Sequence, residues 1–367
     1  MIISKHWLNE WIDLSEVSVE TLSKTLNSIG LEVDSYKEIN LPKSVVVGYV
    51  KSREKHPDAD KLSVCQVDVG SETLQIVCGA KNVEAGQFVP VALIGTTMPN
   101  GLEIKKAKLR GIESCGMICS SAELGLPKTN DGILPLDESI GKLKLGTSLG
   151  EFEAFKDVII EVDVTANRGD CQNLHGIARE ICTALDLNMK DSHENEDSEN
   201  LLGIGRIASV RTEDKVNGSF LYKAFELKNA LSENLLTRLR LALIECQKTN
   251  LVERLLEYAT FCTGVLFRAY DHAKLVGEGE KAVFDIKNGE NGECVVYCGD
   301  KNLGIAGIYQ SDVARVDEKS KVILVEASYV KPDVVSKAIF ENKNLPKGDQ
   351  IYRSSRGSEP NLAYGAD

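Results

Sequence analysis

Short apolar runs that alternate with polar residues fill the segment from about residue 45 to residue 126. Examples are Val-Val-Val-Gly-Tyr-Val at 45–50, Val-Cys-Gln-Val-Asp-Val at 64–69 and Ile-Val-Cys-Gly at 76–79. A period of two is typical of half-buried strands, and the glycine, proline and asparagine residues between the runs are typical of turns. The pattern therefore predicts a small, strand-rich barrel over roughly residues 41–150.

Both flanks of this segment combine helical and strand-like spacing of apolar residues. The spacing predicts helices over residues 4–15, 19–29 and 173–187, and strands over 31–36 and 158–164. Gly30 is expected to stop the second helix. The turn Asn-Arg-Gly-Asp at 167–170 precedes the third helix, and there Arg168 is expected to pair with a carboxylate.

The remainder of the chain is separated from these elements by an acidic stretch. Residues 191–203 are polar and free of aromatic side chains up to the start of a new apolar region, so they are predicted to be a solvated linker. Beyond it, a helix is predicted over residues 232–250. Strands are predicted over residues 207–211, 282–286, 293–297, 304–309 and 322–326.

Composition places the chain among ordinary globular proteins. Its 367 residues are 43% hydrophobic and 27% charged, which fits two or three domains. Lys5, His6, Glu10 and Asp13 interrupt any signal peptide, and no apolar stretch is long enough for a membrane span. Ten scattered cysteines favour reduced thiols and a cytoplasmic protein over a disulfide framework.

The net charge of −12 does not by itself favour a nucleic-acid partner. A local basic surface can still contact phosphates on an acidic protein. Such a stripe lies within the barrel segment and consists of Lys105, Lys106, Lys108 and Arg110. Charge alone leaves two interpretations open, a tRNA-binding surface and a solvated strand face, and the barrel motifs favour RNA.

Two cysteine pairs are candidate metal ligands. Cys115 and Cys119, like Cys294 and Cys298, are four residues apart and have no adjacent histidine. That spacing does not match a zinc knuckle. The pairs are therefore interpreted as buried thiols, and no metal site is expected.

Several motifs in the barrel segment occur together in a fixed order. They include His-Pro-Asp-Ala-Asp-Lys-Leu at 56–62, Ile-Val-Cys-Gly-Ala-Lys-Asn at 76–82 and Lys-Leu-Arg-Gly-Ile-Glu-Ser-Cys-Gly-Met-Ile-Cys-Ser at 108–120. This order resembles the tRNA-binding oligonucleotide-fold (OB) domain attached to several aminoacyl-tRNA synthetases. Such a domain is a partly open five-stranded barrel that binds nucleic acid on one face.

The chain as a whole resembles the β subunits of bacterial phenylalanyl-tRNA synthetases. The resemblance rests on the N-terminal 36 residues and on Glu-Val-Asp-Val-Thr-Ala-Asn-Arg-Gly-Asp-Cys at 161–171, His-Gly-Ile-Ala-Arg-Glu at 175–180 and Tyr-Arg-Ser-Ser-Arg-Gly-Ser-Glu-Pro at 352–360. It implies a multidomain α+β protein, an N-terminal portion of a longer subunit. Residues 1–40 and 151–190 would form a small α+β domain into which the OB barrel of 41–150 is inserted. Residues 204–367 would form a larger α+β domain of the editing (B3/B4) type, truncated at its C-terminus.

The resemblance also implies a function. The complete enzyme joins phenylalanine to tRNA-Phe with ATP and Mg²⁺ as an α2β2 assembly, and the α subunit carries the aminoacylation centre. This portion would then supply tRNA binding and structure, with no aminoacylation residues and no cofactor of its own. Its expected partners are the α subunit and tRNA-Phe, with neither DNA nor a membrane.

The family's editing pocket hydrolyses tRNA that carries tyrosine by mistake. Matching position by position, Glu326 retains the family's glutamate, whereas Arg268 replaces a histidine and Gln310 replaces a glycine. Gln350 falls near a small alanine. Arg268 cannot exchange protons near neutral pH, and the glutamines add volume, so the hydrolytic site is expected to be degenerate.

Two other functions remain as alternatives. One is a stand-alone tRNA-binding OB-fold protein, which the elements around the barrel disfavour. The other is an independent aminoacyl-tRNA editing hydrolase, which the replaced pocket residues disfavour.

Overall fold

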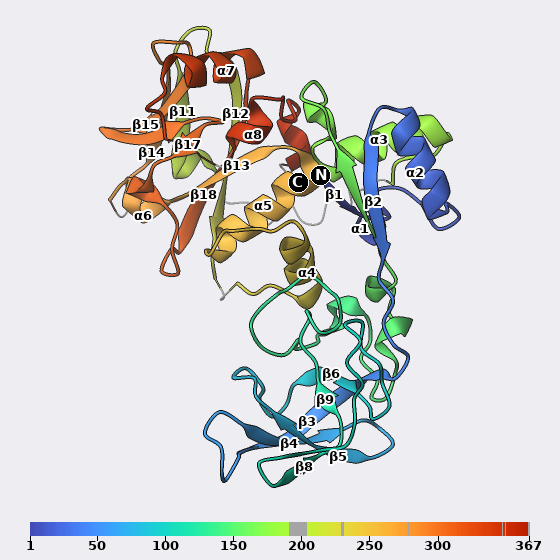
Figure 1. Cartoon of the computed structure of the whole chain (residues 1–367). Coiled ribbons are helices and arrows are strands. Elements are labelled where there is room, and N and C mark those ends of the chain that lie inside the picture. The colour runs from blue at the N-terminus through green and yellow to red at the C-terminus, as the bar shows by residue number, and fades with distance from the viewer. Residues whose placement is uncertain (191–203, 229–230, 278, 347, 349, 366–367) are drawn as a thin grey trace.

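The computed structural model describes residues 1–190, 204–228, 231–277, 279–346, 348 and 350–365. The predicted linker at 191–203 lies outside these residues. Figure 1 shows a strand-rich barrel at one end and two mixed α/β bodies that lie side by side at the other. The predicted α+β class and the near-closed barrel are therefore confirmed.

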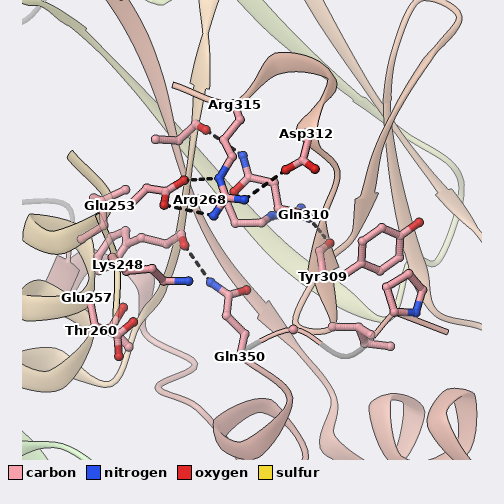
Figure 2. Close-up of a pocket in the computed structure, with 16 residues that line it drawn as sticks. Lys248, Glu253, Glu257, Thr260, Arg268, Tyr309, Gln310, Asp312, Arg315 and Gln350 are labelled. Atoms are coloured by element: carbon pink, nitrogen blue, oxygen red, sulfur yellow. Dashed lines mark hydrogen bonds and ion pairs between the residues drawn. The ribbon is translucent and has the colours of Figure 1, made fainter. Parts of the chain in front are cut away.

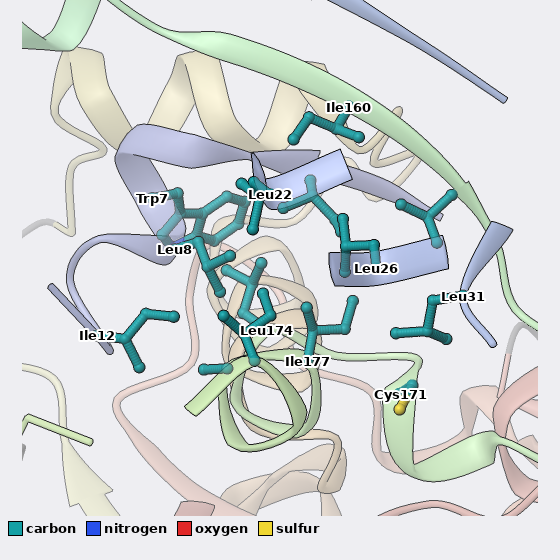
Figure 3. Packing of buried hydrophobic residues seen from close by; sticks show 14 of the residues in the cluster. Trp7, Leu8, Ile12, Leu22, Leu26, Leu31, Ile160, Cys171, Leu174 and Ile177 are labelled. Atoms are coloured by element: carbon teal, nitrogen blue, oxygen red, sulfur yellow. The ribbon is translucent and has the colours of Figure 1, made fainter. Parts of the chain in front are cut away.

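Segments from both sides of the barrel share one antiparallel sheet. Its strands are β1 (Ile2–Ser4), β2 (Glu32–Glu38) and β10 (Val158–Asp163), in the order β1-β10-β2. The central position of β10 pairs residues that follow the barrel with residues that precede it. Helices α1 (Lys5–Leu8), α2 (Val19–Ser28) and α3 (Leu174–Leu185) cover the sheet. Figure 3 shows Trp7, Leu22, Ile160 and Ile177 in their common core.

The N-terminal helix is shorter than predicted. The prediction of a helix over 4–15 is wrong, because α1 ends at Leu8. The side chain of Asn9 accepts a hydrogen bond from the Leu14 amide at 2.7 Å, and Ile12 forms an isolated bridge with Met189. These contacts replace helical hydrogen bonds in the second half of the segment. The second helix ends as predicted, with Gly30 at a φ of 83°.

The barrel is built from five antiparallel strands in the order β5-β4-β3-β6-β9. They are β3 (Val45–Lys55), β4 (Ser63–Asp68), β5 (Thr73–Cys78), β6 (Phe88–Ala92) and β9 (Met117–Ile118). A hairpin of β7 (Ala107–Leu109) and β8 (Ile112–Ser114) lies against β5. Gln75 of β5 holds the hairpin in place. Its backbone carbonyl accepts a hydrogen bond from the Cys115 amide at 2.8 Å, and its side-chain amide donates to the Glu113 carbonyl at 2.9 Å.

Two sheets form the C-terminal body. The first has the order β11-β14-β15-β16-β17, and the second has the order β12-β18-β13. The strands are β11 (Ala208–Thr212), β12 (Gly218–Glu226), β13 (Leu266–Asp271), β14 (Ala282–Asn288), β15 (Cys294–Cys298), β16 (Lys301–Ile305), β17 (Tyr309–Gln310) and β18 (Val322–Val330). The helices are α4 (Leu235–Leu243), α5 (Leu251–Thr263), α6 (His272–Leu275), α7 (Pro332–Glu341) and α8 (Ile351–Ser354).

Two predictions for this body are corrected, and three elements were not predicted. The predicted helix over 232–250 ends at Leu243, and Glu245 then adopts a positive φ of 54°, which breaks the helix. Asn250 begins α5 instead, because its side chain accepts a hydrogen bond from the Val252 amide at 2.9 Å. The strand predicted over 304–309 is observed instead as β16, which ends at Ile305. Strands β12 and β13 were not predicted.

Helix α5 joins the two mixed bodies. The ring of Trp7 stacks on Tyr258 and Phe261 of α5, with centroids 4.9 and 5.1 Å apart. Nearby, a Cβ atom on Gly169 would lie 2.1 Å from the carbonyl oxygen of Arg356. Only a glycine allows this approach, so the Asn-Arg-Gly-Asp turn and the Arg-Gly-Ser-Glu-Pro segment pack directly on each other.

Candidate functional site

A polar cavity of about 330 Å³ lies beside β13, between α5 and the turn that carries β17. Figure 2 shows its lining. Three of the four residues singled out for the editing pocket, Arg268, Gln310 and Gln350, line this cavity. The fourth, Glu326, does not line it and lies behind Arg268 on β18.

Glu326 is enclosed by hydrogen-bond donors. Its side chain is fully buried, and Arg268 is 2% exposed. The Arg268 guanidinium donates to Oε1 of Glu326 from Nε at 2.8 Å and from Nη2 at 2.5 Å. Tyr222 and Tyr270 donate to Oε2 at 2.7 and 3.2 Å. Both carboxylate oxygens are therefore used within the protein.

The charge state of this cluster follows from its burial and its pairing. Burial disfavours the Arg268 cation, but the Glu326 carboxylate more than offsets this and holds the pKa of Arg268 above its ordinary value. Burial also raises the pKa values of Tyr222 and Tyr270 well above the usual range, and the Glu326 carboxylate adds to the effect. Both hydroxyls thus keep their protons and act as donors.

Gln310 and Gln350 lie along the unpaired edge of β13. This strand is at the edge of its sheet, so alternate backbone carbonyls have no partner strand. The side-chain amide of Gln310 donates to the Ala269 carbonyl, and that of Gln350 donates to the Phe267 carbonyl, both at 2.7 Å. The two amides thereby cover backbone acceptors that smaller residues would leave open to the cavity.

Other charged residues at the cavity were not foreseen from the sequence. Arg315 donates to the Glu253 carboxylate at 2.5 Å and to the Asp312 carboxylate at 3.0 Å. Glu253 lies on α5, and the helix itself was not predicted. The Asn250 cap followed three residues later by an acidic residue was the available signal for it. Arg315, Glu253 and Asp312 therefore form one group of paired charges at the cavity (Figure 2).

The basic stripe lies on and beside the β7–β8 hairpin. Lys105 pairs with Glu103 at 2.7 Å, and Lys106 pairs with Glu113 at 2.9 Å. In the part of the chain that the structure describes, Lys108 has no ion-pair partner, and neither does Arg110 in the turn between the strands. The stripe therefore consists of two cations in surface ion pairs and two without a carboxylate partner among the described residues.

A buried histidine holds this hairpin against the β3–β4 loop. His56 is buried, and its Nδ1 accepts a hydrogen bond from the Asp58 amide at 3.1 Å. The other ring nitrogen then carries the proton, which it donates to the Leu109 carbonyl at 3.1 Å. The His-Pro-Asp motif thus positions the strand that carries Lys108.

The cysteine pairs behave as thiols in a packed interior. Cys119, Cys294 and Cys298 are buried, whereas Cys115 is partly exposed. Among the described residues, no three histidine, cysteine or acidic side chains converge as a metal site would require. No helix in those same residues is long and apolar enough to cross a membrane.

Comparison with protein families matches residues 45–144 to a model described as "Putative tRNA binding domain". These residues cover β3 to β9, including the β7–β8 hairpin. Two solved structures align with part of this chain, and their TM-scores are low. The first is a MetRS related protein from Pyrococcus horikoshii, which is 26% identical over 30% of this chain and 89% of that one, with a TM-score of 0.22. The second is an N-terminal fragment of the phenylalanyl-tRNA synthetase beta-subunit from the same organism, which is 14% identical over 47% of this chain and 56% of that one, with a TM-score of 0.24.

Curated relatives match the whole chain. It is 52% identical to the phenylalanine–tRNA ligase beta subunit of Campylobacter jejuni strain RM1221, 47% identical to that of Sulfurimonas denitrificans, and 38% identical to that of Helicobacter pylori strain 26695. In each case all of this chain is aligned with 46–47% of the relative. The chain thus spans about half the length of these relatives, and it belongs to the family of phenylalanine–tRNA ligase beta subunits.

Proposed function

We propose that this chain contributes tRNA binding and structural domains to a phenylalanine–tRNA ligase. The 52% identity to such a subunit over the whole of this chain carries the proposal. In the complete enzyme, an α subunit carries the aminoacylation centre and assembles with this subunit as α2β2. This cytoplasmic enzyme joins phenylalanine to tRNA-Phe and uses ATP and Mg²⁺.

The domain division follows from the same proposal. Residues 1–40 and 151–190 act as one unit with the barrel of 41–150 inserted, and 204–367 form the editing-like unit. The shared β1-β10-β2 sheet supports the first unit, because its central strand comes from the far side of the barrel.

Co-purification tests the assignment to the ligase. The subunit, extended past Asp367 and expressed with the α subunit of the same organism, is expected to purify as a complex that charges tRNA-Phe with phenylalanine. A chain that binds tRNA without associating with an α subunit would contradict the proposal and favour a stand-alone tRNA-binding protein. Rapid aminoacyl-tRNA hydrolysis without such association would favour the editing-hydrolase alternative.

The β7–β8 hairpin is the proposed tRNA contact within the barrel. The hairpin lies inside the matched tRNA-binding region, and the cations of Lys108 and Arg110 project from its strand and turn without intramolecular carboxylate partners among the described residues. Lys105 and Lys106 must exchange a carboxylate for a phosphate, so each of them should contribute less than the other two.

Replacing Lys108 and Arg110 with alanine is expected to weaken tRNA binding and to flatten its salt dependence. Each lost phosphate contact should reduce the slope of log K against log salt by about one unit. Lys51→Ala is the control, because Lys51 lies elsewhere on the barrel and pairs with Asp68 at 2.7 Å. An unchanged slope in the double variant would show that the hairpin is only a solvated face.

The cavity beside β13 is proposed to have lost editing activity. The glutamate that the family uses there is engaged by Arg268 and two tyrosines, and Gln310 and Gln350 cover the strand edge. A carboxylate with both oxygens occupied and no path to the cavity cannot position a water for hydrolysis. Glu326 is therefore assigned a structural role.

A further inference from the structure

A groove of about 510 Å³ lies on the barrel beside the β7–β8 hairpin. Its walls come from the end of β5, from β7 and the residues before it, and from the loop that contains Asp131. Figure 1 shows β5 and β8 at the end of the barrel that lies away from the two mixed bodies. Every residue of the groove falls within 45–144, the region matched to the tRNA-binding model. Its volume is within the usual range of about 300–1,000 Å³ for sites of organic ligands.

The groove offers an apolar surface that the fold leaves partly uncovered. Ile104 and Ile118 line it as buried side chains, whereas Leu109 of β7 lines it and is 41% exposed. Unstacked nucleobases pack between aromatic or apolar side chains of this kind. A flat ring that enters the groove can therefore bury the exposed part of Leu109.

Strand β7 presents the groove and the free cation on opposite faces. Ala107 and Leu109 line the groove, and Lys108 between them does not, because successive side chains of a strand point to opposite sides. Arg110 follows in the turn at the tip of the hairpin. A nucleotide strand that crosses β7 can thus place phosphates near Lys108 and Arg110 and a base in the groove.

The charges inside the groove disfavour a phosphate there. Glu103, Glu123 and Asp131 line it, together with a single cation, Lys105. Lys105 pairs with Glu103 at 2.7 Å, and Asp131 pairs with Lys128 at 2.5 Å. The excess of carboxylates repels an anion but attracts a neutral group that carries N–H donors.

Glu123 is held in place through one carboxylate oxygen only. Its Oε2 accepts hydrogen bonds from the Ser120 amide at 2.7 Å and from the Ser120 hydroxyl at 2.8 Å. Among the described residues, its Oε1 accepts none, and the side chain is partly exposed on the groove wall. An ionised carboxylate has acceptor capacity on both oxygens. Oε1 is therefore an oriented acceptor for a donor group in the groove.

We propose that the groove binds one unpaired RNA base that carries an exocyclic amino group. The amino group donates to Oε1 of Glu123, in the way that a glutamate accepts from N4 of cytosine. The ring packs against Leu109. Uracil carries a carbonyl oxygen in place of that amino group, and the carboxylate repels it. The proposal rests on the tRNA contact proposed for the hairpin and specifies what the barrel reads beside it.

Two matched single strands test the base preference. Fluorescence anisotropy of the 367-residue chain is measured with labelled oligocytidylate and oligouridylate of equal length at one salt concentration. Both carry the same number of phosphates, so their electrostatic contributions are alike. Oligocytidylate is expected to bind about tenfold more tightly. Equal binding of the two strands would overturn the base preference alone, whereas a failure to bind these strands and tRNA would overturn the tRNA contact as well.

Glu123→Gln tests the position of the base. The glutamine oxygen can still accept from Ser120, but its NH2 group takes the place of Oε1 and cannot accept from an amino group. The preference for oligocytidylate is expected to disappear. Glu84→Gln is the control and should retain it, because Glu84 lies on the barrel 3.8 Å from Arg53 and does not line the groove. An unchanged preference in Glu123→Gln would place the base elsewhere and overturn the proposal.

Discussion

Glu326→Gln is expected to lower the free energy of unfolding by about 3–5 kcal/mol, although it exchanges one atom. The variant leaves Arg268, which is 2% exposed, as a buried cation without its counterion. Arg268→Gln should be similarly destabilising, because it leaves the fully buried Glu326 carboxylate with only the tyrosine hydroxyls as donors. Removing either charge of a buried ion pair leaves the other charge desolvated without a partner, and this lowers the stability of the fold.

The double variant Arg268→Gln/Glu326→Gln is expected to cost much less than the sum of the two single variants. It removes both charges together, and an amide at position 326 can still accept hydrogen bonds from Tyr222 and Tyr270. The coupling free energy should lie near the upper end of the usual range of about 0.5–3 kcal/mol for residues in contact.

Denaturant unfolding of the variants measures this coupling. Hydrogen exchange at the amides of β13 and β18 identifies the transition in which their sheet unfolds. Asp317→Asn is the control, since Asp317 pairs with Lys274 at 2.7 Å on the surface, where solvent screening leaves such a pair with little effect on stability. Additive effects of the two substitutions would show that Arg268 and Glu326 do not act as a pair.

The barrel was accessible from the sequence because its strands alternate on a half-buried surface and are separated by turn residues. The first helix was not, because Ile12 forms a bridge with Met189, which lies far along the chain, and Asn9 accepts a hydrogen bond locally from the Leu14 amide. Helical spacing in 4–15 carries no trace of such a partner. Tertiary contacts thus overrode a local preference.

The candidate site was identified residue by residue, but its arrangement was not. Arg268 and Glu326 stand directly opposite each other on β13 and β18, a cross-strand register that requires both strands to be known. Every residue of β13 is buried, so the strand lacks the polar alternation that would reveal it. The substitution at position 268 and the retained glutamate at 326 therefore looked independent in the sequence, whereas in the structure they form one ion pair.

The second large effect concerns hydrolysis of misacylated tRNA. The assembled enzyme is expected to deacylate tyrosyl-tRNA-Phe at close to the uncatalysed rate. Glu326 has no free oxygen, Arg268 offers a permanent cation where proton exchange is needed, and the Gln310 and Gln350 amides fill the edge of β13. The Arg268→Gln/Glu326→Gln variant should then hydrolyse no more slowly than the unaltered enzyme.

Loss of editing has a consequence for the accuracy of charging. An apolar synthetic pocket rejects an added hydroxyl by only about a hundredfold. Without hydrolysis in the β subunit, discrimination against tyrosine must rest on the synthetic site or on a separate hydrolase. Detectable tyrosylation of tRNA-Phe by the purified enzyme is therefore the expected corollary.

Single-turnover deacylation of tyrosyl-tRNA-Phe by the assembled ligase measures most directly whether the cavity beside β13 is closed to chemistry. The reaction without enzyme gives the background, and the Arg268→Gln/Glu326→Gln variant, which removes both charges, shows whether these residues take part. The structure predicts that all three rates agree closely. Rapid hydrolysis by the unaltered enzyme that falls to background in the variant would show that Glu326 is catalytic and that the cavity still edits.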